Sequence, residues 1–294
     1  MGLARATIKL LMRECQREAF SGGVLELGKQ DILATPSDLR KWAKEMRFDL
    51  KPWVRMELSE KPDMRLLNYI SDFPLFKSLG FDHVDSIDDN NYEGCTIVHD
   101  MNKEVPPELQ GRFDAIYDGG TSEHIFNLPR AFANYAKMLK VSGRIIHSLP
   151  SSNYLDHGLY MFTPNLFLEY YSANGWKIES LFLIRQRTSK DDHKWEIYEY
   201  EPGGLSRHRI GGVSGMFVIF CVAKKLTAST YDAPVRQGCF EETRKRSASG
   251  GETVPEAKAA GRLPKWVKNL LVPIYARIIG LIPLKFFLKL VARY

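Results

Sequence analysis

The sequence predicts an α/β fold built on an open, mostly parallel sheet, and one stretch of the chain carries most of that prediction. A short apolar run from Phe113 to Tyr117 ends at Asp118-Gly119-Gly120, as a buried strand ends at a turn. Apolar residues then recur at spacings of three and four over 128–139, which indicates one face of a helix, and Gly143 precedes a second apolar run. A strand, a crossover helix and a parallel strand form a βαβ unit. Because ligands bind at the carboxyl ends of strands in such sheets, we expect a site at residues 118–127.

The size and composition favour a globular protein in a reducing compartment. With 294 residues, of which 44% are hydrophobic, the chain has ample material for a sizeable core. Its four cysteines lie far apart and form no CxxC pair, which argues against a zinc cage and a disulfide framework. The first twenty residues mix charge into every turn and lack a small-residue cleavage site, so we interpret them as an amphipathic helix covering the sheet. These features favour a cytoplasmic protein.

The positive charge of the chain is concentrated near its C-terminus. The net charge is +6, and residues 257–294 contain eight basic residues and no acid, so the rest of the chain is faintly acidic. A nucleic-acid-binding domain usually carries a net positive charge, whereas residues 1–256 do not. We therefore expect no binding of nucleic acid.

Three further segments in the first half of the chain are candidates for short strands. The first covers 24–27, the second covers 83–88, and the third covers 95–98. Asp88 ends the second run and Asp100 follows the third closely. Acids at the ends of strands suit the binding of ribose and adenine, and they are also common helix caps.

An insertion over residues 35–77 separates the first two of these runs. It is longer than a simple crossover needs, and a helix is predicted at 37–46. Such insertions often form a lid or a substrate wall, and the alternative is a packed surface excursion.

The segments beyond Ser148 predict a loop, a helix and two more strands. The loop covers 150–158, and the helix begins with Thr163 as cap and Pro164 in its first turn. The strands are expected at 177–185 and 215–223, with a surface hairpin or flap between them at 189–212.

The C-terminal quarter divides into a linker and a tail. Residues 226–261 lose apolar density and are predicted to be a flexible linker. Residues 262–294 combine aliphatic and basic residues at helical spacing, which predicts a basic amphipathic tail of helical pieces joined at Pro273 and Pro283. The apolar residues of the tail need a cover, and a membrane surface, the catalytic domain itself or a second copy in a homodimer would each supply one.

Four strand ends together resemble the class I S-adenosylmethionine-dependent methyltransferases over residues 22–225, taken as one domain beginning at residue 1. These are Glu26-x-Gly28, Asp88, Asp100 and the loop with Glu123-His124. The resemblance implies a seven-stranded, mostly parallel Rossmann-like sheet with helices on both faces, a final antiparallel hairpin, and S-adenosylmethionine as cofactor. The segment DHGLYMFTPNLF, residues 156–167, is also similar to a loop of bacterial methyltransferases that act on glycans and the cell surface.

The resemblance also implies roles for individual residues. Glu26 and Gly28 would lie beside the methionine moiety, Asp88 would accept hydrogen bonds from the ribose hydroxyls, and Asp100 with Met101 would frame the adenine. Asp118 and Gly119 begin the segment that would close over the sulfonium. The chain departs from the glycine-rich pattern of the family, since only Gly28 remains of its glycines, and Gln30 would hydrogen-bond the carboxylate or ribose instead.

Two loop histidines are candidates for the catalytic base. Methyl transfer to a hydroxyl needs alignment and the removal of one proton, and imidazole titrates in the useful range. His124 follows the fourth predicted strand. His157 lies in the next loop and is favoured over His124, because Asp156 adjoins it and is expected to assist it in catalysis. The alternative is a structural, hydrogen-bonded role for each histidine. The set His157, Asp156 and His124 has no diagnostic metal-binding spacing, so no metal is expected.

These observations favour a cytoplasmic methyltransferase, free or held at the inner membrane face by its tail. We expect O-methylation of a sugar, a cell-envelope intermediate or a secondary metabolite, so that the partner is a small-molecule or glycan acceptor. The alternative from another class is a catalytically silent Rossmann-like module that serves as a membrane-tethered scaffold in envelope synthesis. A nicotinamide-dependent enzyme is disfavoured because GxGxxG is absent after the first strand.

Overall fold

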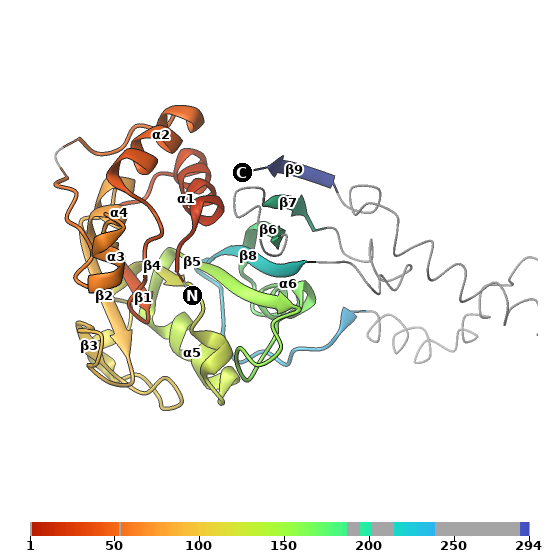
Figure 1. Cartoon of the computed structure of the whole chain (residues 1–294). Coiled ribbons are helices and arrows are strands. Elements are labelled where there is room, and N and C mark those ends of the chain that lie inside the picture. The colour runs from red at the N-terminus through yellow and green to blue at the C-terminus, as the bar shows by residue number, and fades with distance from the viewer. Residues whose placement is uncertain (1, 53, 187–194, 201–214, 239–288, 294) are drawn as a thin grey trace, which may run out of the picture.

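The computed structural model describes residues 2–52, 54–186, 195–200, 215–238 and 289–293, and a nine-stranded sheet runs through them (Figure 1). The strand order is β3-β2-β1-β4-β5-β8-β6-β7-β9. The strands are β1 Gly23–Leu27, β2 His83–Asp88, β3 Ile97–Val98, β4 Phe113–Asp118, β5 Leu139–Ser152, β6 Lys177–Gln186, β7 Glu196–Glu199, β8 Met216–Lys224 and β9 Lys289–Arg293. The expected number of seven strands is therefore corrected to nine among the described residues, because β7 and β9 extend the sheet.

The sheet divides into a parallel half and an antiparallel half. The neighbouring strands from β3 to β5 all run parallel, and β5, β8, β6, β7 and β9 pair antiparallel. The predicted antiparallel hairpin of β6 and β8 is confirmed, and the expectation of a mostly parallel sheet is wrong because half of the pairs are antiparallel. Chain order reverses between β1 and β4, which is where open α/β sheets place their ligands.

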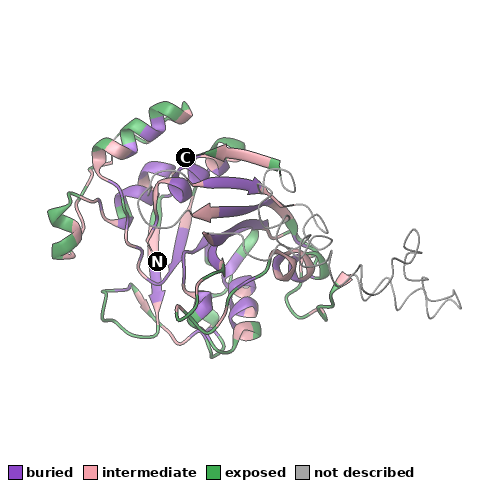
Figure 2. Ribbon diagram, turned by 45° about the vertical axis from the view of Figure 1, so that its right-hand side comes forward, coloured by how far each residue is buried: buried purple, intermediate pink, exposed green. Residues whose placement is uncertain are grey.

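Helices cover both faces of the sheet, as predicted. The α-helices are α1 Arg5–Arg17, α2 Pro36–Met46, α3 Pro62–Leu66, α4 Asp72–Leu79, α5 Leu128–Met138 and α6 Pro164–Ala173, with 3-10 turns η1 Pro107–Leu109 and η2 Ser122–His124. Buried residues of α1, α2 and α4 pack in one core cluster, and those of α5 and α6 pack in the other. The central strands are buried on both sides between these layers (Figure 2).

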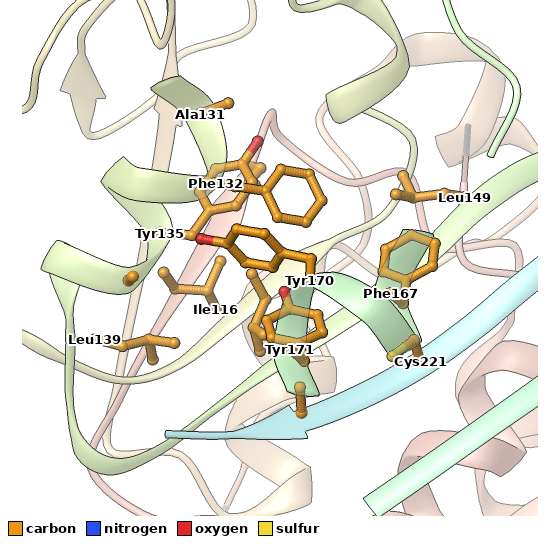
Figure 3. Close-up of a cluster of buried hydrophobic side chains, with 14 of the residues drawn as sticks. Ile116, Ala131, Phe132, Tyr135, Leu139, Leu149, Phe167, Tyr170, Tyr171 and Cys221 are labelled. Atoms are coloured by element: carbon orange, nitrogen blue, oxygen red, sulfur yellow. The ribbon is translucent and has the colours of Figure 1, made fainter. Parts of the chain in front are cut away.

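Aromatic rings fill the core between α5, α6 and the sheet (Figure 3). The ring of Phe132 lies 4.8 Å from that of Tyr170 and 6.3 Å from that of Phe167, measured between centroids. Aromatic pairs of this kind add about 0.5–1.5 kcal/mol beyond the burial of their area. These ring contacts therefore stabilise the packing of α5 and α6 against the sheet.

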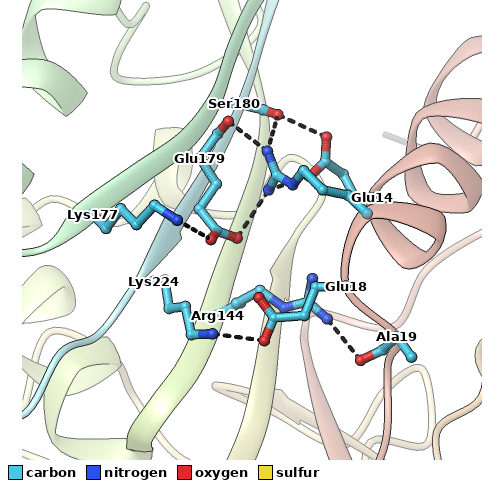
Figure 4. A network of polar contacts seen from close by, with 9 residues as sticks. Glu14, Glu18, Ala19, Arg144, Lys177, Glu179, Ser180 and Lys224 are labelled. Atoms are coloured by element: carbon cyan, nitrogen blue, oxygen red, sulfur yellow. Dashed lines mark hydrogen bonds and ion pairs between the residues drawn. The ribbon is translucent and has the colours of Figure 1, made fainter.

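Polar side chains fasten α1 to the antiparallel half of the sheet (Figure 4). Arg17 forms ion pairs with Glu14 at 2.6 Å and with Glu179 at 2.9 Å, and Ser180 donates a hydrogen bond to Glu14. Lys224 pairs with Glu18 at 2.6 Å. The predicted N-terminal helix is thus confirmed, and both charged and apolar contacts hold it against the sheet.

The insertion over 35–77 contains α2, α3 and α4. The predicted helix at 37–46 is confirmed as α2, where Thr35 and Asp38 form a capping box. Leu39 and Trp42 are buried in the core that also holds α1 and α4. The part of the insertion formed by α2 and α4 is therefore packed against the body, while residues 57–61 line a cavity next to Gln30.

The strand after α5 begins earlier than predicted. α5 ends at Met138 and β5 begins at Leu139, so Gly143 lies inside the strand rather than at the end of the helix. The pairing of β4 with β5 shifts register between Phe113 and Ala115. A Cβ at position 143 would lie 3.0 Å from the carbonyl oxygen of Asp114, so glycine is needed for this close approach of the two strands.

The last described segment is a strand, not a helix, so the prediction of a helical tail is wrong for residues 289–293. In the register of β9 with β7, Lys289 lies opposite Glu199 and Arg293 lies opposite Glu196. Both pairs form ion pairs, at 2.8 Å and 3.7 Å. Basic residues four positions apart suit a helix face, and they also suit one face of a strand, which has a period of two. Residues 262–288 lie outside the described residues.

The beginning of the predicted linker lies against the body. The indole of Trp176 donates a hydrogen bond to the carbonyl of Thr230, and Tyr170 donates one to the carbonyl of Tyr231. Residues 239–261 of the predicted linker lie outside the described residues. None of the helices in the described ranges combines the length and the hydropathy that a membrane span requires.

Candidate functional site

A cavity of about 300 Å³ lies at the carboxyl ends of β1 and β2, beside the loops that follow β3 and β4. Six of the residues predicted from the sequence line it: Gly28, Gln30, Asp88, Asp100, Met101 and His124. Its wall also includes residues that were not predicted, among them Leu27, His99, Asn102, Thr121 and Ile125. The structure therefore brings most of the predicted strand ends together at one place.

The turn after β1 requires a glycine at position 28. Gly28 has a φ of 66°, and a Cβ there would lie 3.0 Å from Oγ1 of Thr121. Thr121 donates a hydrogen bond to the carbonyl of Leu27 at 2.5 Å, which joins the ends of β1 and β4. Glycine at position 28 therefore has a geometric reason.

Gln30 packs into the turn that follows β1. Its Nε2 donates hydrogen bonds to the carbonyls of Leu27 and Gly28, at 3.0 and 3.2 Å. Its Oε1 packs so closely on Gly119 that a Cβ there would lie 2.3 Å away. Among the described residues, Oε1 of Gln30 is buried without a hydrogen-bond partner. The amide nitrogen of Gln30 is therefore engaged with the backbone, and its oxygen remains an acceptor without a donor among the described residues.

Glu26 lies behind Gln30 and is fully buried. Its Oε2 accepts a hydrogen bond from the backbone N–H of Gln30 at 3.1 Å, and its Oε1 has no hydrogen-bond partner among the described residues. Burial raises the pKa of Glu26 well above its ordinary value, and the charge of Asp72 raises it further. Two acceptors that are buried without donors among the described residues thus lie close together, one at the end of β1 and one in the turn after it, which is unusual in a folded protein.

Asp88 and Asp100 differ in their availability to a ligand. Asp88 accepts a hydrogen bond from the N–H of Asp89 through Oδ1, while its Oδ2 lies towards Gly28. Burial raises the pKa of Asp88. Oδ1 of Asp100 accepts two hydrogen bonds from Asn102, which lower its pKa. Asp100 therefore caps its own turn, and the apolar wall at this end comes from Met101.

His99, which directly precedes Asp100 in the sequence, was not predicted as a site residue. It lines the cavity, and its Nε2 is buried without a partner among the described residues. Its position directly after β3 was the available signal, because residues at that edge of the sheet meet the ligand.

Asp118 and Gly119 do not line the cavity. Asp118 is fully buried at the end of β4, where its Oδ2 lies 2.8 Å from Nδ1 of His147 and accepts a hydrogen bond from Ser122 at 2.5 Å. The other ring nitrogen of His147 lies 2.7 Å from the hydroxyl of Tyr171. Asp118 is therefore placed to hold the loop after β4, rather than to contact a ligand.

The two predicted histidines lie together, and the carboxylate beside them is Glu123. The rings of His124 and His157 are 5.5 Å apart, and Nε2 of His157 lies 3.3 Å from Oε1 of Glu123. Asp156 is exposed and takes no part in this cluster. Burial raises the pKa of Glu123 to about 7, and burial lowers the pKa of His124.

No family model matches the chain, and no curated protein matches it. Many solved structures align with it, and they include several S-adenosylmethionine-dependent methyltransferases. One from Thermotoga maritima is 12% identical over 74% of this chain and 87% of its own, with a TM-score of 0.35. A protein from Bacillus halodurans that is described as a putative methyltransferase is 14% identical over 76% of this chain and 100% of its own, with a TM-score of 0.37. Geranyl diphosphate methyltransferase in complex with S-adenosylmethionine is 12% identical over 75% and 85%, with a TM-score of 0.36. Likenesses of this size do not identify the function, which has to be inferred from the residues of this chain.

Replacing Gly28 with Ala should destabilise the protein more than replacing Gly94 with Ala. Both glycines have a positive φ, 66° and 73°, so both changes cost about 1–2 kcal/mol of backbone strain. Position 94 is open, with no atom within 4 Å of an added Cβ, whereas position 28 is crowded by Thr121. Urea denaturation of the two variants measures the difference, and equal losses would remove the geometric reason for Gly28.

Replacing Glu26 with Gln should raise the stability of the unliganded protein at neutral pH. A carboxyl whose pKa is higher in the folded state than in the unfolded state loses folding free energy as the pH rises above the unfolded pKa. Glu26 is such a group. The free energy of unfolding of E26Q should therefore exceed that of the wild type by a growing amount as the pH rises above about 4.5. Glu45, whose pKa is lowered by Lys9, is the control: E45Q should lose stability over the same range. Denaturation at pH 4 and pH 8 measures both, and a fall for E26Q would contradict the assignment.

Proposed function

We propose that this protein is an S-adenosylmethionine-dependent methyltransferase that binds its methyl donor in the cavity at the ends of β1 and β2. The observation that carries the proposal is the pair of unpaired buried acceptors, Oε1 of Glu26 and Oε1 of Gln30, at the turn beside that cavity. Buried acceptors without donors are costly unless a ligand supplies the donors. The α-ammonium group of the methionine moiety is a cation with three N–H donors, so it fits this turn.

The remaining wall of the cavity suits the nucleoside part of the donor. Asp88 would accept hydrogen bonds from the ribose hydroxyls, since its Oδ2 lies on the side of Gly28. Met101 and Ile125 supply apolar surface for the adenine ring. His99 would use its unpaired Nε2 to hydrogen-bond the base. When bound, the donor supplies an electrophilic methyl group, and the residues of the chain orient it and exclude water.

The acceptor would reach the methyl group from the side of the loops after β4 and β5. His124 lines the cavity, and His157 stands beside it with Glu123. This cluster would promote the loss of the acceptor proton, which favours transfer to a hydroxyl oxygen. Asp156, which was predicted to assist, is replaced in this role by Glu123.

The same two loops carry exposed apolar side chains, which bears on the kind of acceptor. Phe126 is 75% exposed, Leu155 is 81% exposed and Leu159 is 61% exposed. Tyr160 donates a hydrogen bond to the carbonyl of Phe126, so the two loops are in contact. We infer an acceptor that joins a hydroxyl group to an apolar portion, such as a cell-envelope intermediate or a secondary metabolite, in preference to an unsubstituted sugar.

The alternative function is a silent Rossmann-like scaffold without cofactor. It is favoured by the loss of the later glycines and by the way in which Gln30 packs into the turn after β1. Attachment of residues 262–288 to a membrane surface or to a second copy, and residence in the cytoplasm, stay predictions under either function. Binding of the methyl donor separates the two, because a scaffold has no need of it.

Replacing Asp88 with Asn should weaken the binding of S-adenosylmethionine by tenfold or more. Hydrogen bonds to a charged group contribute about 1.5–3 kcal/mol, and the ribose would form them with Asp88. Asp85 is the matched control, because it lies on the same strand and pairs with Arg112 outside the cavity. Isothermal titration calorimetry of the wild type, D88N and D85N measures the three affinities.

D85N should bind the donor as the wild type does. A wild-type protein that gives no binding heat and no thermal shift with S-adenosylmethionine at millimolar concentration would contradict the proposed function and favour the scaffold. Equal affinities of D88N and wild type would leave donor binding in place and remove the role of Asp88.

A further inference from the structure

Three potential metal ligands converge beside the cavity, and one of them, His124, also lines it. Glu123, His124 and His157 each offer one ligand atom, and these three atoms lie within 4.8 Å of one another. Glu123 and His124 belong to η2 after β4, whereas His157 belongs to the loop after β5. The cluster therefore joins two segments that are more than thirty residues apart in sequence, as metal ligands commonly do.

The carboxylate in the cluster has no donor to satisfy it. Glu123 is fully buried, and neither of its oxygens has a hydrogen-bond partner among the described residues. Nε2 of His157 is buried 3.3 Å from Oε1 of Glu123, without hydrogen-bond geometry. A buried carboxylate is costly unless it is paired, hydrogen-bonded or bound to a metal. A cation between the three side chains would satisfy both oxygens and the ring nitrogen together.

The backbone holds these side chains in place before any ion binds. The carbonyl of Glu123 accepts hydrogen bonds from the N–H groups of Leu159 and Tyr160, which join the two loops. A Cβ at position 158 would lie 2.9 Å from Cγ of Glu123, so Gly158 gives the carboxylate its room. Asp118 accepts hydrogen bonds from the N–H groups of Thr121 and Ser122 and so fixes the start of η2. Preorganised ligands of this kind are what a metal site needs.

The donor set indicates the class of ion. Two imidazole nitrogens and one carboxylate oxygen suit divalent first-row transition metals such as zinc, iron or cobalt, and they suit magnesium and calcium poorly. Three protein ligands leave coordination positions open, which is the arrangement of catalytic rather than structural sites. The neighbouring cavity, which His124 also lines, gives the open positions access to a substrate.

We propose that Glu123, His124 and His157 bind one divalent transition-metal ion that holds the acceptor hydroxyl for methylation. This role rests on the function proposed above. The ion lowers the pKa of the hydroxyl, whose proton passes to solvent. The oxygen then forms a bond to the methyl carbon of S-adenosylmethionine as the carbon–sulfur bond breaks, and the electron pair of that bond stays on sulfur as S-adenosylhomocysteine leaves.

Metal uptake by the full chain tests the site without any need for activity. The purified protein is stripped with a chelator and titrated with Zn²⁺ by calorimetry, and with Co²⁺ by visible absorption. The wild type should bind one ion and give the absorption of cobalt bound to nitrogen and oxygen. H124A and H157A should each bind at least tenfold more weakly, since even the loss of a supporting contact costs 10–100-fold in metal affinity.

Two control variants identify the ligands. D156N changes the exposed carboxylate next to His157, and H99A changes a histidine of the same cavity outside the cluster, so both should bind the metal as the wild type does. Should H157A fail to fold by circular dichroism, E123Q tests the same site with a side chain of the same size. No stoichiometric uptake by the wild type, or equal uptake by wild type, H124A and H157A, would overturn the proposal and leave an ion pair of His157 with Glu123.

The same titrations separate this proposal from the proposed function. Metal binding is measured without methyl donor, and donor binding is measured on the stripped protein. A chain that binds S-adenosylmethionine and no metal overturns only the metal site. A chain that binds the metal and no donor supports the site and overturns its role in methyl transfer.

Discussion

Two fully buried glutamates, Glu26 and Glu123, have carboxylate oxygens without a hydrogen-bond partner among the described residues: one oxygen of Glu26 and both oxygens of Glu123. A protein tolerates such groups only where another part of the structure compensates for their cost or where a ligand completes them. Both lie at the same edge of the sheet, Glu26 near the end of β1 and Glu123 in the loop after β4. The donor site and the metal site proposed above follow from this single constraint, since each supplies a cation to one of the two carboxylates.

The loop after β4 connects the two sites. Asp118 anchors it from below through His147 and Ser122, and Thr121 ties it to the end of β1. His124, at the end of the same loop, lines the donor cavity and also belongs to the metal cluster. A ligand in the cavity and an ion in the cluster would therefore be held at a fixed distance by one short segment. This is the alignment that an in-line transfer between them needs.

Much of the fold could be predicted from the sequence, because strand and helix periods are local signals. The runs at β1, β2 and β4 and the helix face of α5 were readable in this way, and so were the acids at the strand ends. β9 could not be predicted, because the spacing of Lys289 and Arg293 fits a helix as well as a strand. The strand is favoured by the two glutamates of β7 that lie opposite them, and this pairing is not visible in the local sequence. The early start of β5 was missed for a related reason, since the contact of Gly143 with Asp114 is tertiary.

The candidate site shows the same division between local and tertiary information. Gly28 and Asp88 follow from their positions after strands. The part played by Glu123 does not, because an acid next to His124 gives no sign that it is buried, whereas Asp156 next to His157 looks the better partner in sequence and proves to be exposed. The structural role of Asp118 could not be predicted either. Its position at the end of β4 does not reveal that it contacts the buried His147 on β5.

The most direct test is to compare the binding of S-adenosylhomocysteine with that of its analogue lacking the α-amino group. If Glu26 and Gln30 accept hydrogen bonds from that amino group, the wild type should bind the analogue at least tenfold more weakly, since a hydrogen bond to a charged group contributes about 1.5–3 kcal/mol. In E26Q the difference should shrink. Equal affinity of the wild type for the two compounds would contradict the claim that the unpaired acceptors at the end of β1 and in the turn after it hold the methyl donor.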